Sequence, residues 1–243
     1  MFEIKIANLR VRVDNRYGYV AHLCREYVVE PCENPDLLIR VEESEILSEM
    51  AMVEHEVTDS YAEAICVYRK ICQHLPQKFQ AFLMHCAVIE YEGRGYAFAA
   101  RSGTGKSTHI ALWQKRFGDG VTVINGDKPI FRFLDGKLYA FGTPWCGKEG
   151  LHTNAATPLA AICFLERSPV NTIHKISPGE AIGRIFQQIL TPDDLPTLDA
   201  LIPLLDSMLC EIPCYSLGCN ISEEAAEVAY FGMKNETEKG SKQ

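Results

Sequence analysis

The segment from Tyr96 to Gly118 constrains the fold of this chain more than any other part of the sequence. It opens with an apolar run, Tyr96–Ala100, that is typical of a buried strand. A polar loop follows, formed by Ser102, Gly103, Thr104, Gly105, Lys106, Ser107 and Thr108. Apolar side chains then recur at helical spacing up to Gly118, a residue type common where helices end. The sequence therefore predicts a strand, a glycine-containing loop and a helix in direct succession.

The loop has the composition of a phosphate-binding loop. Gly103 and Gly105 allow the backbone to turn with its N–H groups pointing inward, and unpaired amides at the helix start add positive partial charge. Lys106 is then placed to reach the β- and γ-phosphates of a nucleotide, and the Ser107 hydroxyl to bind Mg²⁺. Ala100 stands where the strict motif has glycine. The alternative is a surface turn with an incidental lysine, but the flanking strand and helix favour nucleotide binding.

Composition and charge restrict the partners. The chain has 243 residues, 47% of them hydrophobic, and a formal net charge of −8. This length suits one sizeable core with a smaller lobe. The negative charge argues against a nucleic acid or an anionic membrane as partner. No apolar run approaches the roughly 20 residues of a membrane span. The first residues alternate like a strand and do not form a secretion signal, so we expect a cytoplasmic protein.

The ten cysteines are interpreted as small buried residues of an intracellular protein. No Cys-x-x-Cys pair occurs, and most of them lie in apolar runs. Cys210, Cys214 and Cys219 form a cluster, but their spacing fits no zinc template and no nearby histidine completes it. We therefore expect no metal site there.

The pattern divides the chain into a small β-rich lobe over residues 1–57, a connecting helix over 58–79, a larger domain over 80–232 and a disordered tail over 233–243. Short alternating or apolar runs predict strands in the lobe at Phe2–Ile6, Leu9–Val13, Tyr27–Val29 and Leu37–Val41. A capping box from Ser60 to Glu63 predicts the start of the connecting helix. The tail has almost no apolar residues.

The larger domain contains several local signals. Asp135-Gly136 predicts the turn of a hairpin between apolar runs, and Ala160–Leu165 reads as a buried strand. Ser177-Pro178-Gly179-Glu180 predicts a capped helix start. Further elements are expected as a helix around 198–209, a strand near 212–217 and a helix over 222–231.

An acid follows the strand Val121–Ile124, which comes directly after the loop helix. Ligands of open α/β sheets bind at the carboxyl ends of strands. Asp127 is therefore placed to meet Mg²⁺ or a substrate hydroxyl. Its alternative role is that of a plain turn former.

Two other side chains are candidates for the same chemistry. His85 stands at the start of the hairpin that leads into the loop, where a histidine beside phosphate is expected to titrate near neutrality. The alternative is a half-buried histidine bonded to backbone. Lys148, in a glycine-rich loop, either clamps the acceptor or the γ-phosphate or is solvated. Trp145 is expected more as a packing anchor than as a stacking surface for adenine. Arg101, Arg132 and Arg184 are weaker candidates.

These residues resemble the catalytic domain of HPr serine kinase/phosphorylase, which shares its P-loop architecture with ATP-dependent phosphoenolpyruvate carboxykinase. The resemblance rests on Ser102–Ser107 after a hairpin, on His85 at the start of that hairpin, and on Asp127 after the next strand. It covers roughly residues 80–220. It implies an α/β fold with a mixed sheet, here with a small N-terminal β-rich lobe added to the P-loop domain.

In that family the histidine lies near the phosphoryl-transfer centre, and two adjacent aspartates supply the base and the metal contact. This sequence has Gly126 in place of one aspartate, and Thr108 where the kinase has glutamate. Together with the residues above, the resemblance implies ATP and Mg²⁺ as cofactors. The expected catalytic residues are Asp127, His85, Lys106 and Lys148, and the expected metal ligands are Ser107 and Asp127. The acceptor is expected to differ from HPr itself.

Three functions remain open at this point. The favoured one is an ATP-dependent kinase for a serine-type hydroxyl of a peptide, a protein or a small molecule. The second is a catalytically weak nucleotide-binding regulatory module, which Gly126 makes plausible. The third, a carboxykinase-like lyase, is disfavoured because the chain is short and shows no second metal-binding set of histidine and lysine. The N-terminal lobe either selects the acceptor, packs on the core or mediates homo-oligomerisation.

Overall fold

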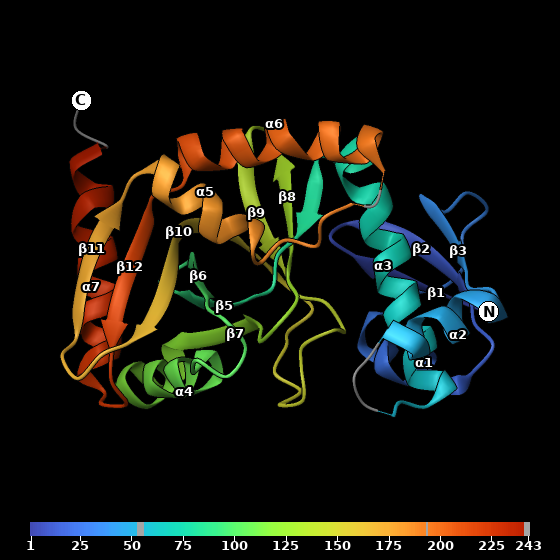
Figure 1. Cartoon of the computed structure of the whole chain (residues 1–243), viewed down its shortest axis with the longest axis horizontal. Coiled ribbons are helices and arrows are strands. Elements are labelled where there is room, and N and C mark those ends of the chain that lie inside the picture. Colours follow the sequence, from blue (N-terminus) through green and yellow to red (C-terminus); the bar gives the residue numbers. More distant parts are fainter. Residues whose placement is uncertain (53–55, 193, 241–243) are drawn as a thin grey trace.

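The computed structural model describes residues 1–52, 56–192 and 194–240, and for residues 235–240 the backbone alone. A small N-terminal lobe lies beside a larger α/β body, and the long helix α3 (Asp59–Phe79) lies between them (Figure 1). The fold class is therefore mixed α/β, as the sequence predicts.

The lobe contains a small sheet flanked by helices. Strands β1 (Phe2–Ile6) and β2 (Leu9–Asp14) form an antiparallel hairpin, and β3 (Leu37–Arg40) pairs with β2 in parallel. Their inward side chains, such as Ile4 and Val11, are fully buried. The lobe also holds α1 (Gly18–Leu23), the 3₁₀ turn η1 (Arg25–Tyr27) and α2 (Glu43–Met52), none of which the sequence pattern indicated.

The strand predicted at Tyr27–Val29 is wrong. Tyr27 ends η1, and Val28 makes only an isolated bridge with Ile4. Tyr27 is 1% exposed, and its hydroxyl lies 3.1 Å from Nδ1 of His152 in the larger body. This long-range contact fixes Tyr27 against the larger body, where the chain turns through η1 instead of continuing as a strand.

Helix α3 occupies the range in which the sequence predicts the connecting helix, but its cap differs. Thr58 is the N-cap, and its hydroxyl accepts a hydrogen bond from the Tyr61 amide at 3.3 Å. The predicted capping acid, Glu63, is fully buried and instead accepts hydrogen bonds from the amides of Arg16 and Tyr17. The helix passes Pro76 and ends at Gln80, which has a φ of 51°.

The larger body is built on one mixed sheet. Its strands run in the order β4-β8-β9-β10-β6-β5-β7, and β12 joins β10 to β11. The bounds are β4 (Ala81–Leu83), β5 (Cys86–Tyr91), β6 (Arg94–Ala99), β7 (Val121–Asn125), β8 (Ile130–Leu134), β9 (Lys137–Phe141), β10 (Ala156–Arg167), β11 (Thr172–Ile176) and β12 (Cys214–Cys219). Strand β10 holds the sheet together, because its first residues pair antiparallel with β9 and its later ones pair in parallel with β6 and β12.

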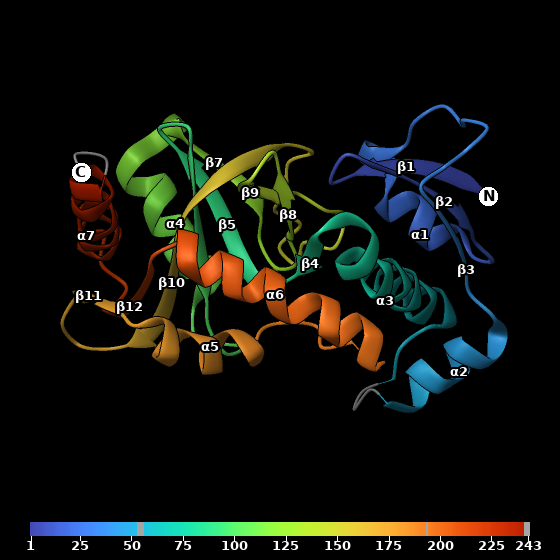
Figure 2. The same ribbon diagram turned by 90° about the horizontal axis from the view of Figure 1, so that it is seen from above.

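Helices cover both faces of this sheet (Figure 2). Helices α5 (Pro178–Phe186) and α6 (Leu195–Glu211) pack on one face, and α4 (Lys106–Phe117) and α7 (Glu224–Gly240) pack on the other. The side chains of β6 alternate between the two faces of the sheet, and apolar side chains on each face require a covering helix. Ala97 and Ala99 join the core under α5 and α6, whereas Tyr96 and Phe98 join the core under α4 and α7.

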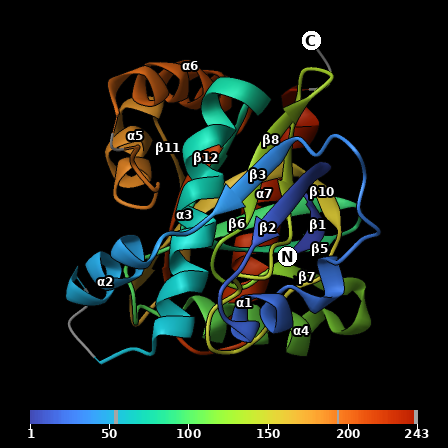
Figure 3. The same ribbon diagram turned by 90° about the vertical axis from the view of Figure 1, so that its right-hand side faces the viewer.

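Helix α3 connects the lobe to the body. Its buried side chains belong to the lobe core, which extends to Ile130 and Phe141 of the body. Near the C-terminal end of α3, the side-chain nitrogen Nε2 of Gln77 donates to the Thr197 hydroxyl of α6 at 2.9 Å. Figure 3 shows α3 between the lobe strands and α6. The lobe is therefore packed on the body and shares a core with it.

Most of the turns and helix starts predicted for the larger domain are present in the structure. The hairpin of β5 and β6 turns at Glu92 and Gly93, and that of β8 and β9 turns at Asp135 and Gly136, all with positive φ. Helix α5 has the predicted capping box at Ser177.

Three elements differ from the prediction. Helix α6 (Leu195–Glu211) is longer than the helix predicted around 198–209 and contains Pro203 in its interior, strand β11 is an addition, and α7 extends to Gly240 although the sequence predicts disorder from residue 233. The buried turns at Ala229 and Met233 form the helix, and adding one residue at a time to an existing helix costs little even where the helix propensity is mixed. Residues 241–243 of the predicted tail lie outside the described residues. Within the described part of the chain, we find no helix with the length and apolar character to cross a bilayer.

Candidate functional site

The glycine loop joins β6 to α4 as the sequence predicts. Gly103 has a φ of 76° and Gly105 one of 126°, so both occupy backbone conformations that other residues avoid. Gly105 is the N-cap of α4, and Lys106 is its first residue. The helix is fixed beneath the sheet by the fully buried Ile110 and Trp113, and it ends at Gly118. The first amides of α4 are therefore held at a defined position beside the loop.

A cavity of about 530 Å³, here called the phosphate cavity, opens at this loop. It brings together candidates from distant parts of the sequence. The predicted residues that line it are His85, Ser102, Gly103, Gly105, Lys106, Ser107, Thr108, Asp127 and Lys148. Gly126 and Glu149 line it as well. Of the predicted loop residues, Thr104 lies outside this cavity and lines two neighbouring hollows instead.

His85 lies between the acid and the lysine. Its Nε2 is 2.9 Å from Asp127 Oδ1 and 3.1 Å from Lys106 Nζ. A single ring nitrogen cannot donate to a carboxylate and accept from an ammonium group in the same protonation state. With a proton on Nε2, His85 donates to Asp127. Without one, it accepts from Lys106, which also donates to the Ala100 carbonyl at 3.4 Å. The protonation of His85 therefore decides which neighbour it binds.

Asp127 is held in its charged form. Burial acts to raise the pKa of Asp127, but the hydrogen bond from His85 and the ion pair with Lys128 outweigh it and keep the pKa well below its usual range. Burial lowers the pKa of Lys106, and the nearby Asp127 carboxylate opposes this effect. The cavity thus presents an ionised carboxylate beside a partly desolvated ammonium group.

Two buried side chains position Asp127. The side-chain oxygen Oδ1 of Asn125 accepts from the backbone amides of Asp127 and Lys128 at 2.8 and 2.7 Å, which fixes the turn after β7. The side-chain nitrogen Nδ2 of Asn125 donates to the Thr143 carbonyl at 2.9 Å, and the Thr143 hydroxyl donates to the Lys128 carbonyl at 2.7 Å. Both Asn125 and Thr143 are fully buried. This network ties the Asp127 turn to the loop that carries Lys148.

Glycine allows that loop to approach the acid closely. Gly147 has a φ of 80°, and a Cβ at this position would lie 3.2 Å from the Asp127 Cβ. At Gly126, a Cβ would lie 3.1 Å from the Cys146 carbonyl oxygen and 3.3 Å from that of Leu151. The space that a second acid would need at residue 126 is therefore bordered by the backbone of the loop.

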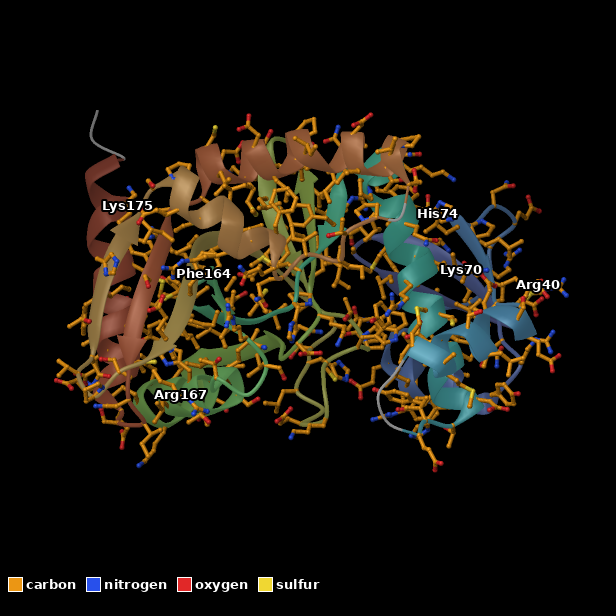
Figure 4. The ribbon with its side chains drawn as sticks, viewed as in Figure 1. Arg40, Lys70, His74, Phe164, Arg167 and Lys175 are labelled. Carbon is orange, nitrogen blue, oxygen red and sulfur yellow. The ribbon has the colours of Figure 1, made fainter. Side chains whose placement is uncertain are left out.

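Three neighbours of the site were not predicted. Lys128 pairs with Asp127, and its place beside a predicted acid was the only available signal. The Gln188 carbonyl accepts from the His85 amide at 2.6 Å. With its side-chain nitrogen facing the two carbonyls, Gln188 also donates to His85 at 3.1 Å and to Ala100 at 3.3 Å. Arg167, at the end of β10 near α4 (Figure 4), donates to the Gly103 carbonyl at 2.6 Å and so braces the glycine loop.

Other candidates lie elsewhere. Trp145 is 8% exposed and its Nε1 donates to the Ala64 carbonyl at 3.1 Å, in keeping with a packing anchor. Arg132 donates to the Ala7 carbonyl, and Arg184 pairs with Glu166. Arg101 is exposed and lines the neighbouring hollow instead of the phosphate cavity. All ten cysteines lie among the described residues and are free. Among those residues, no group of three or more acidic, histidine or cysteine side chains is arranged to hold a metal ion.

No family model matches the sequence, and no curated protein matches it. Among solved structures, the chain is similar to the HPr(Ser) kinase/phosphatase from Coxiella burnetii, with a TM-score of 0.40 and 9% identity. That match covers 65% of this chain and 92% of the other. Similarity at this level does not identify a reaction, which has to be inferred from the site itself.

Proposed function

We propose that this protein is an ATP-dependent phosphotransferase that acts on a hydroxyl group. One observation supports this most strongly: His85 lies 3.1 Å from Lys106 of the glycine loop and 2.9 Å from the charged Asp127, and all three line one cavity. A lysine beside glycine-loop amides suits a phosphate group, and an ionised acid beside it suits the proton of an attacking hydroxyl.

The nucleotide would lie across the loop. The β- and γ-phosphates would occupy the phosphate cavity, next to Lys106 and the amides of the loop. A second hollow of about 520 Å³ adjoins the other side of the loop and is lined by Thr108, Leu112 and Pro169. Because this hollow follows the first turn of α4, it suits the α-phosphate and the nucleoside. The nucleotide would then point its γ-phosphate at Asp127.

The donors present fit a magnesium ion. The Ser107 hydroxyl and the Asp127 carboxylate line the phosphate cavity, and both are hard oxygen ligands of the kind that Mg²⁺ takes alongside phosphate oxygens and water. When bound, the ion would neutralise charge on the transferring phosphoryl group. Asp127 Oδ1 faces His85 and Oδ2 faces Lys128, so the carboxylate has two differently placed oxygens for these roles.

The transfer itself requires positioning and charge neutralisation more than covalent help. The acceptor oxygen forms a bond to the γ-phosphorus while the bond from that phosphorus to the β,γ-bridging oxygen breaks, and ADP leaves. The hydroxyl proton passes to Asp127. Lys106 neutralises charge that develops on the phosphoryl oxygens. When Lys106 turns toward phosphate, His85 loses its ammonium neighbour and can donate to Asp127, which keeps the carboxylate oriented.

The test compares two substitutions in the same helix. Lys106→Met removes the phosphate-binding ammonium group, whereas Lys115→Met removes a lysine of α4 that is 70% exposed and paired with Glu223. We expect Lys106→Met to lower phosphoryl transfer from labelled ATP by about 10²-fold or more and Lys115→Met to leave it unchanged. Equal rates for Lys106→Met and the parent would refute the proposal. ATP binding without turnover would favour a regulatory module, and oxaloacetate-dependent release of CO₂ would favour a lyase.

A further inference from the structure

A second cavity of about 590 Å³, here called the lobe cavity, lies between the N-terminal lobe and the phosphate cavity. Asp127, Gly147 and Lys148 line both cavities. The remaining walls of the lobe cavity come from α1, α2, α3 and the loop around Trp145. Any group that enters the lobe cavity from the lobe side therefore reaches the same carboxylate as the γ-phosphate does from the other side.

Aromatic rings form much of the wall. Tyr19 and Tyr61 lie at the opening, 38% and 46% exposed, with ring centroids 6.0 Å apart. Tyr68 and Trp145 lie deeper, with centroids 5.8 Å apart. The Trp145 ring is fixed by its hydrogen bond to the Ala64 carbonyl. Such rings offer flat apolar faces that bind the flat face of a ring-shaped ligand.

The same wall carries two ion pairs. Glu49 is only 3% exposed and is paired with Arg69, whose Nε and Nη2 lie 3.1 and 3.3 Å from its carboxylate oxygens. Lys128 lies 5.9 Å from the Tyr68 ring centroid and pairs with Asp127. Arg69 and Lys128 remain partly exposed, so a ligand that covers them removes water from their charged groups and has to offer hydrogen bonds in return, which several hydroxyls on the ligand would supply.

Resting on the proposed function, we propose that the lobe cavity binds the phosphoryl acceptor, and that the acceptor is a small polyhydroxylated ring of the sugar or cyclitol type. Its flat face would lie on the tyrosine rings, and its hydroxyls would bind Glu49, Arg69 and Lys128. One hydroxyl would reach Asp127 and attack the γ-phosphate. The cavity has the volume of a small-molecule site, whereas the serine side chain of a protein acceptor would fill only a small part of it.

The experiment uses the full chain, labelled ATP with Mg²⁺, and four probes: glucose, ribose, myo-inositol and a short serine-containing peptide. We expect transfer to at least one ring polyol. Tyr61→Ala should raise the KM for that polyol about tenfold, which corresponds to about 1.4 kcal/mol, and leave the Kd for ATP unchanged. Tyr17→Ala is the matched control, because Tyr17 belongs to the same lobe and is 36% exposed but does not line the lobe cavity.

The outcomes separate this inference from the proposed function. Transfer to the peptide alone, or no transfer to any ring polyol while ATP binds normally, overturns the lobe cavity as a polyol site. Equal KM values for Tyr61→Ala and Tyr17→Ala overturn it too. Failure of the parent protein to bind ATP would instead refute the phosphotransferase proposal. Thermal unfolding of both tyrosine variants checks that neither change disturbs the fold.

Discussion

Replacing Gly126 with aspartate would create, next to Asp127, the pair of adjacent acids that the sequence lacks. The backbone around residue 126 predicts that this change fails. A Cβ there would lie 3.1 and 3.3 Å from two carbonyl oxygens and 3.5 Å from the Leu151 Cβ, and the Gly126 amide already donates to the Leu151 carbonyl at 2.9 Å. The new carboxylate would also start beside carbonyl oxygens, which cannot donate hydrogen bonds to it.

The size of the expected loss of stability follows from the crowding around residue 126. Adding a carbon to a packed position costs about 1–3 kcal/mol. For a chain of this size, each kcal/mol shifts the melting temperature by roughly 2–4 °C. We therefore expect Gly126→Ala to lower the melting temperature by about 2–12 °C, and Gly126→Asp to lower it at least as much. Phosphoryl transfer should not increase, because relieving the crowding displaces the loop that carries Lys148.

The control is a glycine with free space around it. A Cβ at Gly183, in the interior of α5, would meet no atom within 4 Å, so Gly183→Ala should stabilise the protein by about 0.5–1 kcal/mol. Thermal unfolding of the three variants, followed by the transfer assay, measures both effects. If Gly126→Asp melts with the parent or transfers phosphate faster, the packing at residue 126 does not explain the missing acid.

Two further predictions concern pH and charge. His109 is 2% exposed, accepts from Trp113 Nε1 at 3.0 Å, and burial lowers its pKa from 6.5 to about 3. Since the unfolded chain takes up this proton below pH 6.5 and the native one does not, stability should fall by about 3 kcal/mol between pH 7.5 and 4.5, and His109→Gln should flatten that slope in urea unfolding. For Asp127 the native pKa is depressed below 3.8, so its stabilising contribution is present above that pH and is lost as pH falls further. Asp127→Asn should therefore be less stable than the parent at pH 7, the gap should close toward pH 2, and transfer should drop about 10²–10⁴-fold. An unchanged gap at low pH, or a parent-like rate, would contradict this role of the carboxylate.

Features encoded within a few neighbouring residues could be predicted. The glycine loop, the turn at Asp135-Gly136 and the capping box at Ser177 each depend on backbone angles or hydrogen bonds inside a short segment. The candidate residues His85, Lys106, Asp127 and Lys148 were also recognisable, because each has a chemistry-bearing side chain beside a strand end or a glycine loop. Whether these four residues lie in one cavity depends on the order of the strands in the sheet, which the sequence does not show.

Features that depend on distant partners could not be predicted. Helix α2 has no strong capping signal, and Glu63 has the sequence position of a capping acid although its carboxylate binds the amides of residues 16 and 17. Gln188 reaches His85 across about a hundred residues, and Arg167 reaches Gly103. Glu49 is a candidate binding residue only because it lines the lobe cavity. Nothing in the local composition around these residues indicates a partner that far along the chain.

The sequence by itself determined that a strand, a glycine turn and a helix start follow one another at residues 96–117. Glycine permits the positive φ that the turn requires, and the backbone amides that form the turn come from neighbouring residues. Only the tertiary structure decided what faces that turn. The register of β5 and β7, and the antiparallel-to-parallel change along β10, determine how His85 and Asp127 approach Lys106. Contacts of this kind depend on how a whole sheet packs, and no short segment contains that information.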